Sequence, residues 1–215
     1  MTNSNFDPQT GWNNVTNDMK GVKPPTKEEM TNMFRGHLLK SLQTDAYRKG
    51  EFTLSSGKKT DHYVNCKPVT LSGEGSILIG TLLLDLVEDD VLAIAGLTLG
   101  ADPLVTAVAM TSWLDNQRRT KLDALIIRKE PKGHGTTSQI EGMLPIQGCK
   151  IVVLEDVVTT GASAMKAVNV LREAGYKVEQ VLSIIDRQED DEANNLFEKE
   201  NIELISLFTL DDVSY

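Results

Sequence analysis

Cysteine and long hydrophobic runs are scarce in this sequence. Among its 215 residues only Cys66 and Cys149 are cysteines, and they form no CxxC pair, which argues against a disulfide framework or a structural zinc site. No stretch approaches the ~20 apolar residues that cross a bilayer, and the polar N-terminus lacks the basic and apolar regions of a signal peptide. We therefore expect a cytoplasmic protein with reduced thiols and no membrane partner.

An excess of positive charge is also lacking. The chain has 22 basic and 31 acidic residues, which gives a formal net charge of -9. A surface that binds nucleic acid or an anionic membrane must be basic enough to offset phosphate charge. The composition therefore favours neither partner, and any site for an anion must be a local feature.

The length and a hydrophobic fraction of 40% predict one folded domain rather than two. Residues 1–25 are rich in Asn, Thr, Gly and Pro, so we expect a loosely ordered arm there and the domain over residues 26–215. Thr26 and Glu29 form a possible capping box ahead of apolar residues at helical spacing. This first helix is predicted to end near Lys49 and Gly50.

From residue 75 onward, predicted helices and short apolar strands alternate. We expect strands at 91–96, 122–128, 150–156, 178–186 and 202–208, and helices at 75–88, 102–117, 162–174 and 189–198. The segment 129–142 is polar and is expected to be a loop. Continuous runs of Val, Ile and Leu suit a parallel sheet that is covered on both faces. The predicted fold is therefore a doubly wound α/β sheet, in which ligands bind at the carboxyl ends of the strands.

The most informative segment is IVVLEDVVTTGAS, residues 151–163, in which an apolar strand precedes two acids and a turn of small residues. Glu155 and Asp156 would repel a bare phosphate, so hydroxyl groups, a metal ion or both are their expected partners. An ordinary strand end with a Thr or Ser cap is the alternative. A Walker B strand is disfavoured because the chain has no GxxxxGK[ST] motif. The backbone amides of the turn would converge at a helix N-terminus, where unpaired donors and the helix dipole hold a phosphate; they belong to Thr159, Thr160, Gly161, Ala162 and Ser163.

This segment resembles the PRPP signature of the type I phosphoribosyltransferases. In that family the acidic pair contacts the 2′ and 3′ hydroxyls of ribose, and the small-residue turn wraps the 5′-phosphate. The resemblance implies that Glu155 and Asp156 position the ribose of PRPP and that residues 159–163 bind its phosphate. It also implies Mg²⁺ as a cofactor that is bound mainly through PRPP, with no direct protein ligand assigned.

Basic residues concentrate in RKEPKGHGT, residues 128–136. Pyrophosphate is a reasonable target for this local positive charge, and a solvated loop tip is the alternative. Following a strand, however, RKExKxHG resembles the flexible catalytic loop of the orotate phosphoribosyltransferases, in which lysines and a histidine bind pyrophosphate. The resemblance implies PRPP-binding and catalytic roles for Arg128, Lys129, Lys132 and His134. It also implies a homodimer in which this loop reaches into the partner subunit.

Two further segments resemble the same family. FTLSSGKKTDHYVN, residues 52–65, is similar to the segment that builds a small N-terminal hood and the orotate pocket. This similarity implies contacts to the base near Tyr63 and Val64. In SIIDRQE, Arg187 matches the arginine that binds the carboxylate of orotate, a role that suits a planar guanidinium fork.

Alternatives and additions to these contacts concern the ends of the predicted strands 150–156 and 178–186. Taken alone, Arg187 is as consistent with a salt bridge to Asp186 or Glu189 as with a carboxylate site. Thr159 is expected to add a hydrogen bond to the pyrimidine. Both expectations depend on where the fold places the ends of these two strands.

The sequence departs from the family pattern at two positions. The family's turn often reads GPAYKG, with a lysine directed at pyrophosphate, whereas GLTLGAD here has Gly100 at the corresponding place. The lysine of the FxLKSG variant is replaced by Ser55. Lys58 and Lys59 are candidates to compensate for the missing positive charge.

The resemblance extends from about residue 30 to the end of the chain. It implies an enzyme that transfers the phosphoribosyl group of PRPP to orotate, giving orotidine 5′-monophosphate and pyrophosphate in pyrimidine biosynthesis. A purine or uracil phosphoribosyltransferase is one alternative, against which Arg187 and the basic loop argue. A non-catalytic PRPP-sensing regulator is another, and it would be expected to lack the loop and to present a surface for nucleic acid.

Overall fold

The computed structural model describes residues 24–53, 59–131, 139–188 and 190–214. Contacts divide the chain into two compact units, one ending at Met33 and the other beginning at Phe34. The first unit contains the predicted capping box. The amide of Thr26 donates to Glu29 Oε2 at 2.7 Å, and the amide of Glu29 donates to Thr26 Oγ1 at 3.2 Å. Helix α2 spans Lys27–Ser41, so it begins directly after Thr26 and has Glu29 in its first turn.

The predicted end of this helix near Lys49 and Gly50 is wrong. After Ser41 the chain forms a π-helical turn and an antiparallel hairpin, η1 (Leu42–Ala46), β1 (Tyr47–Thr53) and β2 (Lys59–Val64). Phe52 stacks on Tyr63 across the hairpin, with ring centroids 5.1 Å apart. Such cross-strand pairs form only between neighbouring strands, and here they outweigh the weak helix propensity of the segment.

The remaining elements follow the predicted alternation. They are α3 (Lys67–Thr70), α4 (Gly73–Leu84), β3 (Val91–Leu97), α5 (Asp102–Leu114), β4 (Asp123–Ile127), β5 (Ile140–Glu141), β6 (Lys150–Val158), α6 (Ala162–Glu173), β7 (Gln180–Asp186), α7 (Glu192–Lys199), β8 (Glu203–Thr209) and α8 (Leu210–Val213). The sheet has the order β5-β4-β3-β6-β7-β8, with β5 antiparallel and the other strands parallel. The predicted doubly wound α/β fold is confirmed. Strand β5 corrects the loop prediction for 129–142, since two residues are too few to show a period in the sequence.

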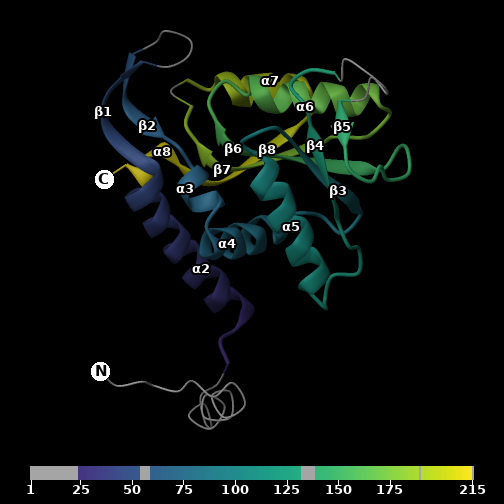
Figure 1. Ribbon diagram of the computed structural model, residues 1–215, viewed down its shortest axis with the longest axis horizontal. Coiled ribbons are helices and arrows are strands. Elements are labelled where there is room, and N and C mark those ends of the chain that lie inside the picture. The colour runs from purple at the N-terminus through teal and green to yellow at the C-terminus, as the bar shows by residue number, and fades with distance from the viewer. Residues whose placement is uncertain (1–23, 54–58, 132–138, 189, 215) are drawn as a thin grey trace, which may run out of the picture. The chain divides into compact units, whose positions relative to one another are not determined.

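Helices cover both faces of this sheet. Within the second unit, α4 and α5 lie on one face and α6 and α7 on the other (Figure 1). Side chains alternate accordingly along the central strands. Ile94 and Leu154 pack into the core on the α5 side, whereas Ala93 and Val153 pack into the core on the α6 side. In the described part of the chain, none of the helices has the length and apolar character that crossing a membrane requires.

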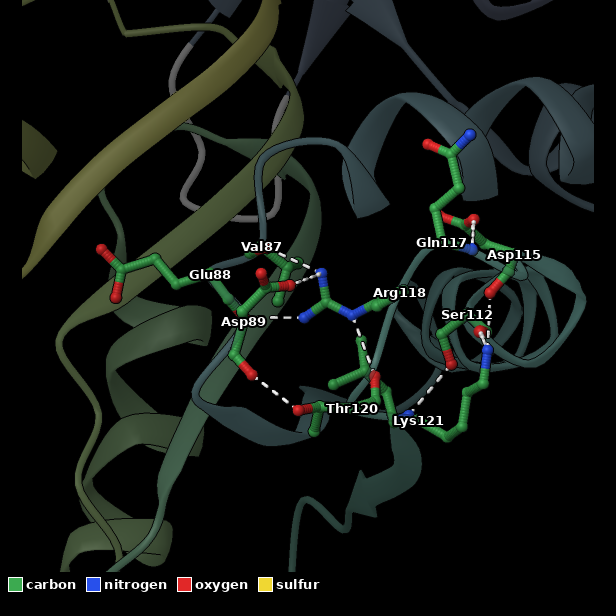
Figure 2. Close-up of polar contacts among 10 residues, drawn as sticks. Val87, Glu88, Asp89, Ser112, Asp115, Gln117, Arg118, Thr120 and Lys121 are labelled. Atoms are coloured by element: carbon green, nitrogen blue, oxygen red, sulfur yellow. Dashed lines mark hydrogen bonds and ion pairs between the residues drawn. The ribbon is translucent and has the colours of Figure 1, made fainter.

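The loops that lead into β3 and β4 are held together by Arg118 (Figure 2). Its guanidinium donates to the carbonyl oxygens of Val87 at 2.9 Å, Glu88 at 2.7 Å and Thr120 at 3.1 Å. The side chain is only 6% exposed. The contacts lie at the amino ends of the strands, at the opposite edge of the sheet from the carboxyl ends.

Arg118→Ala is therefore expected to lower the free energy of unfolding by about 2–3 kcal/mol, because three backbone carbonyls, two of them partly buried, lose a charged donor. Urea denaturation measures this change. Arg119→Ala, which removes an exposed neighbouring arginine, is the matched control. Equal unfolding free energies for the two variants would contradict the structural role of Arg118.

Candidate active site

Two acids lie near the carboxyl end of β6, the strand between β3 and β7. Glu155 is 8% exposed, and the side chain of Asp156 is 15% exposed. Asp156 Oδ1 accepts a hydrogen bond from the amide of Val157 at 3.0 Å. Glu155 Oε2 is buried without a hydrogen-bond partner among the described residues. A buried acceptor of this kind costs free energy unless a ligand or water satisfies it, which marks the position as a binding site.

The two carboxyl groups differ in protonation. Burial, and next the charge of Asp156, raise the pKa of Glu155 from its ordinary value of 4.5 to about 8. Glu155 is therefore mainly protonated at neutral pH and can donate a hydrogen bond to a ligand oxygen. The negative charge of the pair then resides on Asp156.

The shifted pKa makes a testable contribution to the pH dependence of stability. A carboxyl whose pKa is higher in the folded state binds its proton more tightly there. Its stabilising contribution is thus fully present below pH 4.5 and is lost as the pH rises to about 8. The unfolding free energy of the wild type should fall relative to that of Glu155→Gln across this window. Urea denaturation of both proteins at several pH values measures the difference, and parallel curves would contradict the shift.

The turn after β6 has the geometry that was predicted for a phosphate site. Gly161 has a φ of 77°, and a Cβ added there would lie 3.0 Å from Phe197 Cζ, so both conformation and packing call for glycine. The turn leads directly into the 12-residue helix α6. Its residues line a hollow of about 90 Å³ at the helix N-terminus, namely Glu155, Thr159, Thr160, Gly161, Ala162 and Ser163. The structure thus brings the predicted phosphate-binding residues together.

The turn after β3 lies against the acidic pair. A Cβ added at Gly100 would lie 2.6 Å from Asp156 Oδ1. Thr98 Oγ1 donates to Asp102 Oδ2 at 2.8 Å, while Asp102 Oδ1 is buried without a partner among the described residues. Lys67 Nζ is 3.8 Å from Asp156 Oδ2. Sequence reasoning missed Lys67 because NCKPVT carries no recognisable motif and only the fold brings it to β6.

Arg187 follows the end of β7 and lies beside the phosphate turn, since its amide donates to the carbonyl of Val158 at 2.8 Å. The carboxylate of Asp186 accepts two hydrogen bonds from Gln188, both at 2.9 Å. No ion pair between Arg187 and Asp186 is found in the described part of the chain. The alternative partner Glu189 lies outside the described residues.

The structure describes only part of the predicted basic loop. Arg128 is exposed at the end of β4, with Nη1 3.3 Å from Glu141 Oε1 on β5. Lys129 is exposed as well. Four residues that the sequence analysis singled out lie outside the described residues: Lys132, His134, Ser55 and Lys58.

The hairpin borders a second, larger hollow. Tyr63 is 41% exposed and Val64 is half-buried on β2. The hollow has a volume of about 700 Å³ and is lined by residues 59–62 of β2 and by residues at and after the ends of β7 and β8, among them Asp186 and Gln188. Tyr63, Val64 and Arg187 are not among its lining residues. Lys59, one of the two candidates for compensating charge, lies in this hollow and not beside the acidic pair.

Known proteins resemble this chain over most of its length. It is 55% identical over 179 residues to orotate phosphoribosyltransferase of Thermosynechococcus vestitus, which covers 83% of this chain and 92% of that protein. It is 48% identical over 192 residues to orotate phosphoribosyltransferase of a Nostoc species, which covers 89% of this chain and 90% of the relative. No family model matches the chain.

Solved structures agree with these relatives. Orotate phosphoribosyltransferase of Mycobacterium tuberculosis H37Rv in complex with PRPP superposes with a TM-score of 0.67 at 32% identity, covering 84% of this chain and 98% of that one. Another structure of the same enzyme gives a TM-score of 0.71 at 34% identity, with 85% and 99% covered. Adenine phosphoribosyltransferase of Leishmania tarentolae shares only 16% identity at a TM-score of 0.57, covering 84% and 90%, which is a likeness of fold alone.

Proposed function

The chain belongs to the orotate phosphoribosyltransferase family, and we propose that it transfers the phosphoribosyl group of PRPP to orotate at the carboxyl end of β6. The observation that carries this proposal is the acidic pair beside the phosphate turn. Asp156, together with the unpartnered oxygen of Glu155, offers acceptors for two adjacent ribose hydroxyls. The backbone amides of residues 159–163 follow the end of β6, at the start of α6, and suit the 5′-phosphate.

Magnesium is the proposed cofactor, carried mainly by PRPP. Among the described residues, no group of three His, Cys, Asp or Glu side chains could hold a metal ion by itself. The unpartnered buried oxygens of Glu155 and Asp102 nevertheless fit a hard cation, because they can accept hydrogen bonds from its coordinated water. When bound, the ion neutralises charge on the pyrophosphate.

The reaction that we propose breaks the bond between C1′ and the pyrophosphate oxygen and forms a bond between C1′ and N1 of orotate. The chain supplies position and charge rather than a covalent nucleophile. Asp156 holds the ribose, while Arg128, Lys129, Lys132 and His134 stabilise the departing pyrophosphate. Closure of the loop would also keep water from the cation-like ribosyl centre.

Orotate is the proposed acceptor because of Arg187. A guanidinium presents two parallel donors that match a planar carboxylate, and adenine, hypoxanthine and uracil carry no such group. Thr159, Tyr63 and Val64 are proposed to contact the pyrimidine ring. The position of Arg187 next to Val158 supports this arrangement, since it adjoins the phosphate turn.

We also propose that the protein works as a homodimer with the basic loop shared between subunits. Apolar side chains are exposed on α5 and around it: Met110 at 51%, Trp113 at 63%, Leu114 at 72% and Leu99 at 64%. Large apolar side chains gathered on one element favour a protein interface. A fully active monomer in sedimentation would contradict this assembly. The free thiols of Cys66 and Cys149 suit a cytoplasmic location.

The test follows the loss of orotate absorbance with purified protein, PRPP and Mg²⁺, in parallel with adenine, hypoxanthine, xanthine and uracil. Consumption of orotate alone, abolished by EDTA, is the expected result. Turnover of another base would favour a purine or uracil enzyme. Binding of PRPP without turnover of any base would indicate a regulator.

A further inference from the structure

Lys67 is the basic residue that the structure places against the acidic pair. Its ammonium is 3.8 Å from Asp156 Oδ2, and its side chain is 41% exposed at the start of α3. This distance exceeds the length of a hydrogen bond, so the contact is an ion pair. The N–H groups of Lys67 therefore donate no hydrogen bond to Asp156. The lysine is thus positioned to donate to a ligand that reaches Asp156.

The neighbouring turn cannot provide such a cation from Gly100. A Cβ at this position would lie 2.6 Å from Oδ1 and 2.9 Å from Cγ of Asp156. Any longer side chain at residue 100 would therefore displace the carboxylate that is proposed to hold the ribose. Positive charge at this place must come from another element, and Lys67 on α3 provides it.

The direction of the ligand across the site follows from the neighbours of β6. The phosphate turn packs toward α7, because Gly161 lies against Phe197 and Ala193. Gly100 follows β3, which pairs with β6 on the side opposite β7. A ribose with its 5′-phosphate in the turn and its hydroxyls on Asp156 therefore directs C1′, and the pyrophosphate attached to it, toward the β3 side.

The space and the charges on the β3 side of the site suit the pyrophosphate of PRPP. Lys67 borders a hollow of about 430 Å³ whose lining includes Leu99, Asp102 and Thr106. The carboxylates of Asp102 and Asp156 lie at the same edge of the sheet, so a pyrophosphate bound there would be repelled unless a cation lies nearby. Lys67 offsets this repulsion with a positive charge beside Asp156.

We propose that Lys67 is a PRPP-binding residue whose ammonium turns from Asp156 to the pyrophosphate when the ribose hydroxyls occupy that carboxylate. It takes the place of the turn lysine that Gly100 lacks, a role that the sequence analysis assigned to Lys58 or Lys59. This inference rests on the proposed function. It adds a specific binding residue to the reaction without altering the chemistry.

The experiment compares Lys67→Met with Lys177→Met, which removes an exposed lysine at the opposite edge of the sheet. Loss of a charged contact to phosphate oxygen is expected to raise the KM for PRPP in Lys67→Met by about 10- to 100-fold. The KM for orotate should stay within about twofold of the wild type, since Arg187 follows β7, whereas the hollow that Lys67 borders is lined by residues that follow β3, on the other side of β6. Lys67→Arg, which keeps the charge, should recover most of the affinity for PRPP.

Two product-like inhibitors locate the contact. Magnesium pyrophosphate should inhibit Lys67→Met much more weakly than the wild type, whereas ribose 5-phosphate should inhibit both equally. Equal weakening of both inhibitors would show that Lys67 only holds Asp156 in place and would overturn the proposal. So would a KM for PRPP like that of Lys177→Met, or a Lys67→Gln variant that is folded by circular dichroism and binds magnesium pyrophosphate normally.

The outcome for the wild type separates this inference from the proposed function. If the wild-type protein does not consume orotate, the proposed function fails and the kinetic comparison does not arise. Calorimetry of magnesium pyrophosphate binding then tests the role of Lys67 directly. Weaker binding to Lys67→Met than to Lys177→Met supports the inference that Lys67 contacts pyrophosphate, and equal binding overturns this inference. If the wild type is active and the variants match it, only the inference about Lys67 is lost.

Discussion

Asp156→Asn is expected to lower kcat/KM for PRPP by about 100- to 10,000-fold, because two ribose hydroxyls lose a charged acceptor worth about 1.5–3 kcal/mol each. The pKa of Glu155, raised to about 8, leaves Asp156 as the charged member of the pair at neutral pH. The amide oxygen of Asn still accepts hydrogen bonds but carries no full charge. It also presents donors toward Lys67, which replaces an attraction with a repulsion.

Steady-state kinetics with varied PRPP and saturating orotate measure this effect. Asp123→Asn, at the amino end of β4, makes the same chemical change away from the site and should retain wild-type activity. Thermal unfolding of both variants checks that the fold is intact. Unchanged turnover and unchanged affinity for PRPP in Asp156→Asn would remove the proposed role of this carboxylate in positioning the ribose.

Arg187→Leu is expected to raise the KM for orotate by about 100-fold or more, because a bidentate charged contact is lost and the carboxylate of the base has to be desolvated without a partner. The KM for PRPP should change little, since the hydrogen bond that joins Arg187 to the strand before the phosphate turn is made by its backbone amide to the carbonyl of Val158, and the substitution leaves that amide in place. The selective effect on one substrate distinguishes a binding role from a structural one.

Arg187→Lys provides a finer measurement. A lysine keeps the charge but cannot form the planar fork, so an intermediate KM for orotate is expected. Arg119→Leu, which removes an exposed arginine before β4, is the matched control. A KM for orotate that is the same in Arg187→Leu and Arg119→Leu would show that the carboxylate binds elsewhere, for example in the hollow lined by Lys59.

Elements that depend on local pattern were predictable from the sequence. The capping box of Thr26 and Glu29 joins residues three apart, so its hydrogen bonds follow from spacing alone. The apolar runs of β3 and β6 are buried on both faces, and such strands have a composition that few other structures share. The turn 159–163 is likewise local, because its glycine, its helix start and its acids are contiguous.

Elements whose stability comes from distant residues were not predictable. The end of α2 at Ser41 depends on a hairpin in which residues of β1 pair with partners that lie 6 to 17 positions further along the chain. Strand β5 exists because Ile140 and Glu141 meet the edge of β4, and two residues by themselves have no detectable period. In both cases a tertiary contact outweighs a weak local preference.

By itself the sequence determined the chemistry of the phosphate turn, the presence of an acidic pair and the alternation of the main strands and helices from residue 75 onward, since each of these follows from neighbouring residues. Only the tertiary structure decided which other groups meet that pair. It packed Gly100 against Asp156, brought Lys67 within 3.8 Å of the same carboxylate, and buried Glu155 deeply enough to raise its pKa. Desolvation and long-range charge depend on three-dimensional proximity, and no spacing in the sequence encodes them.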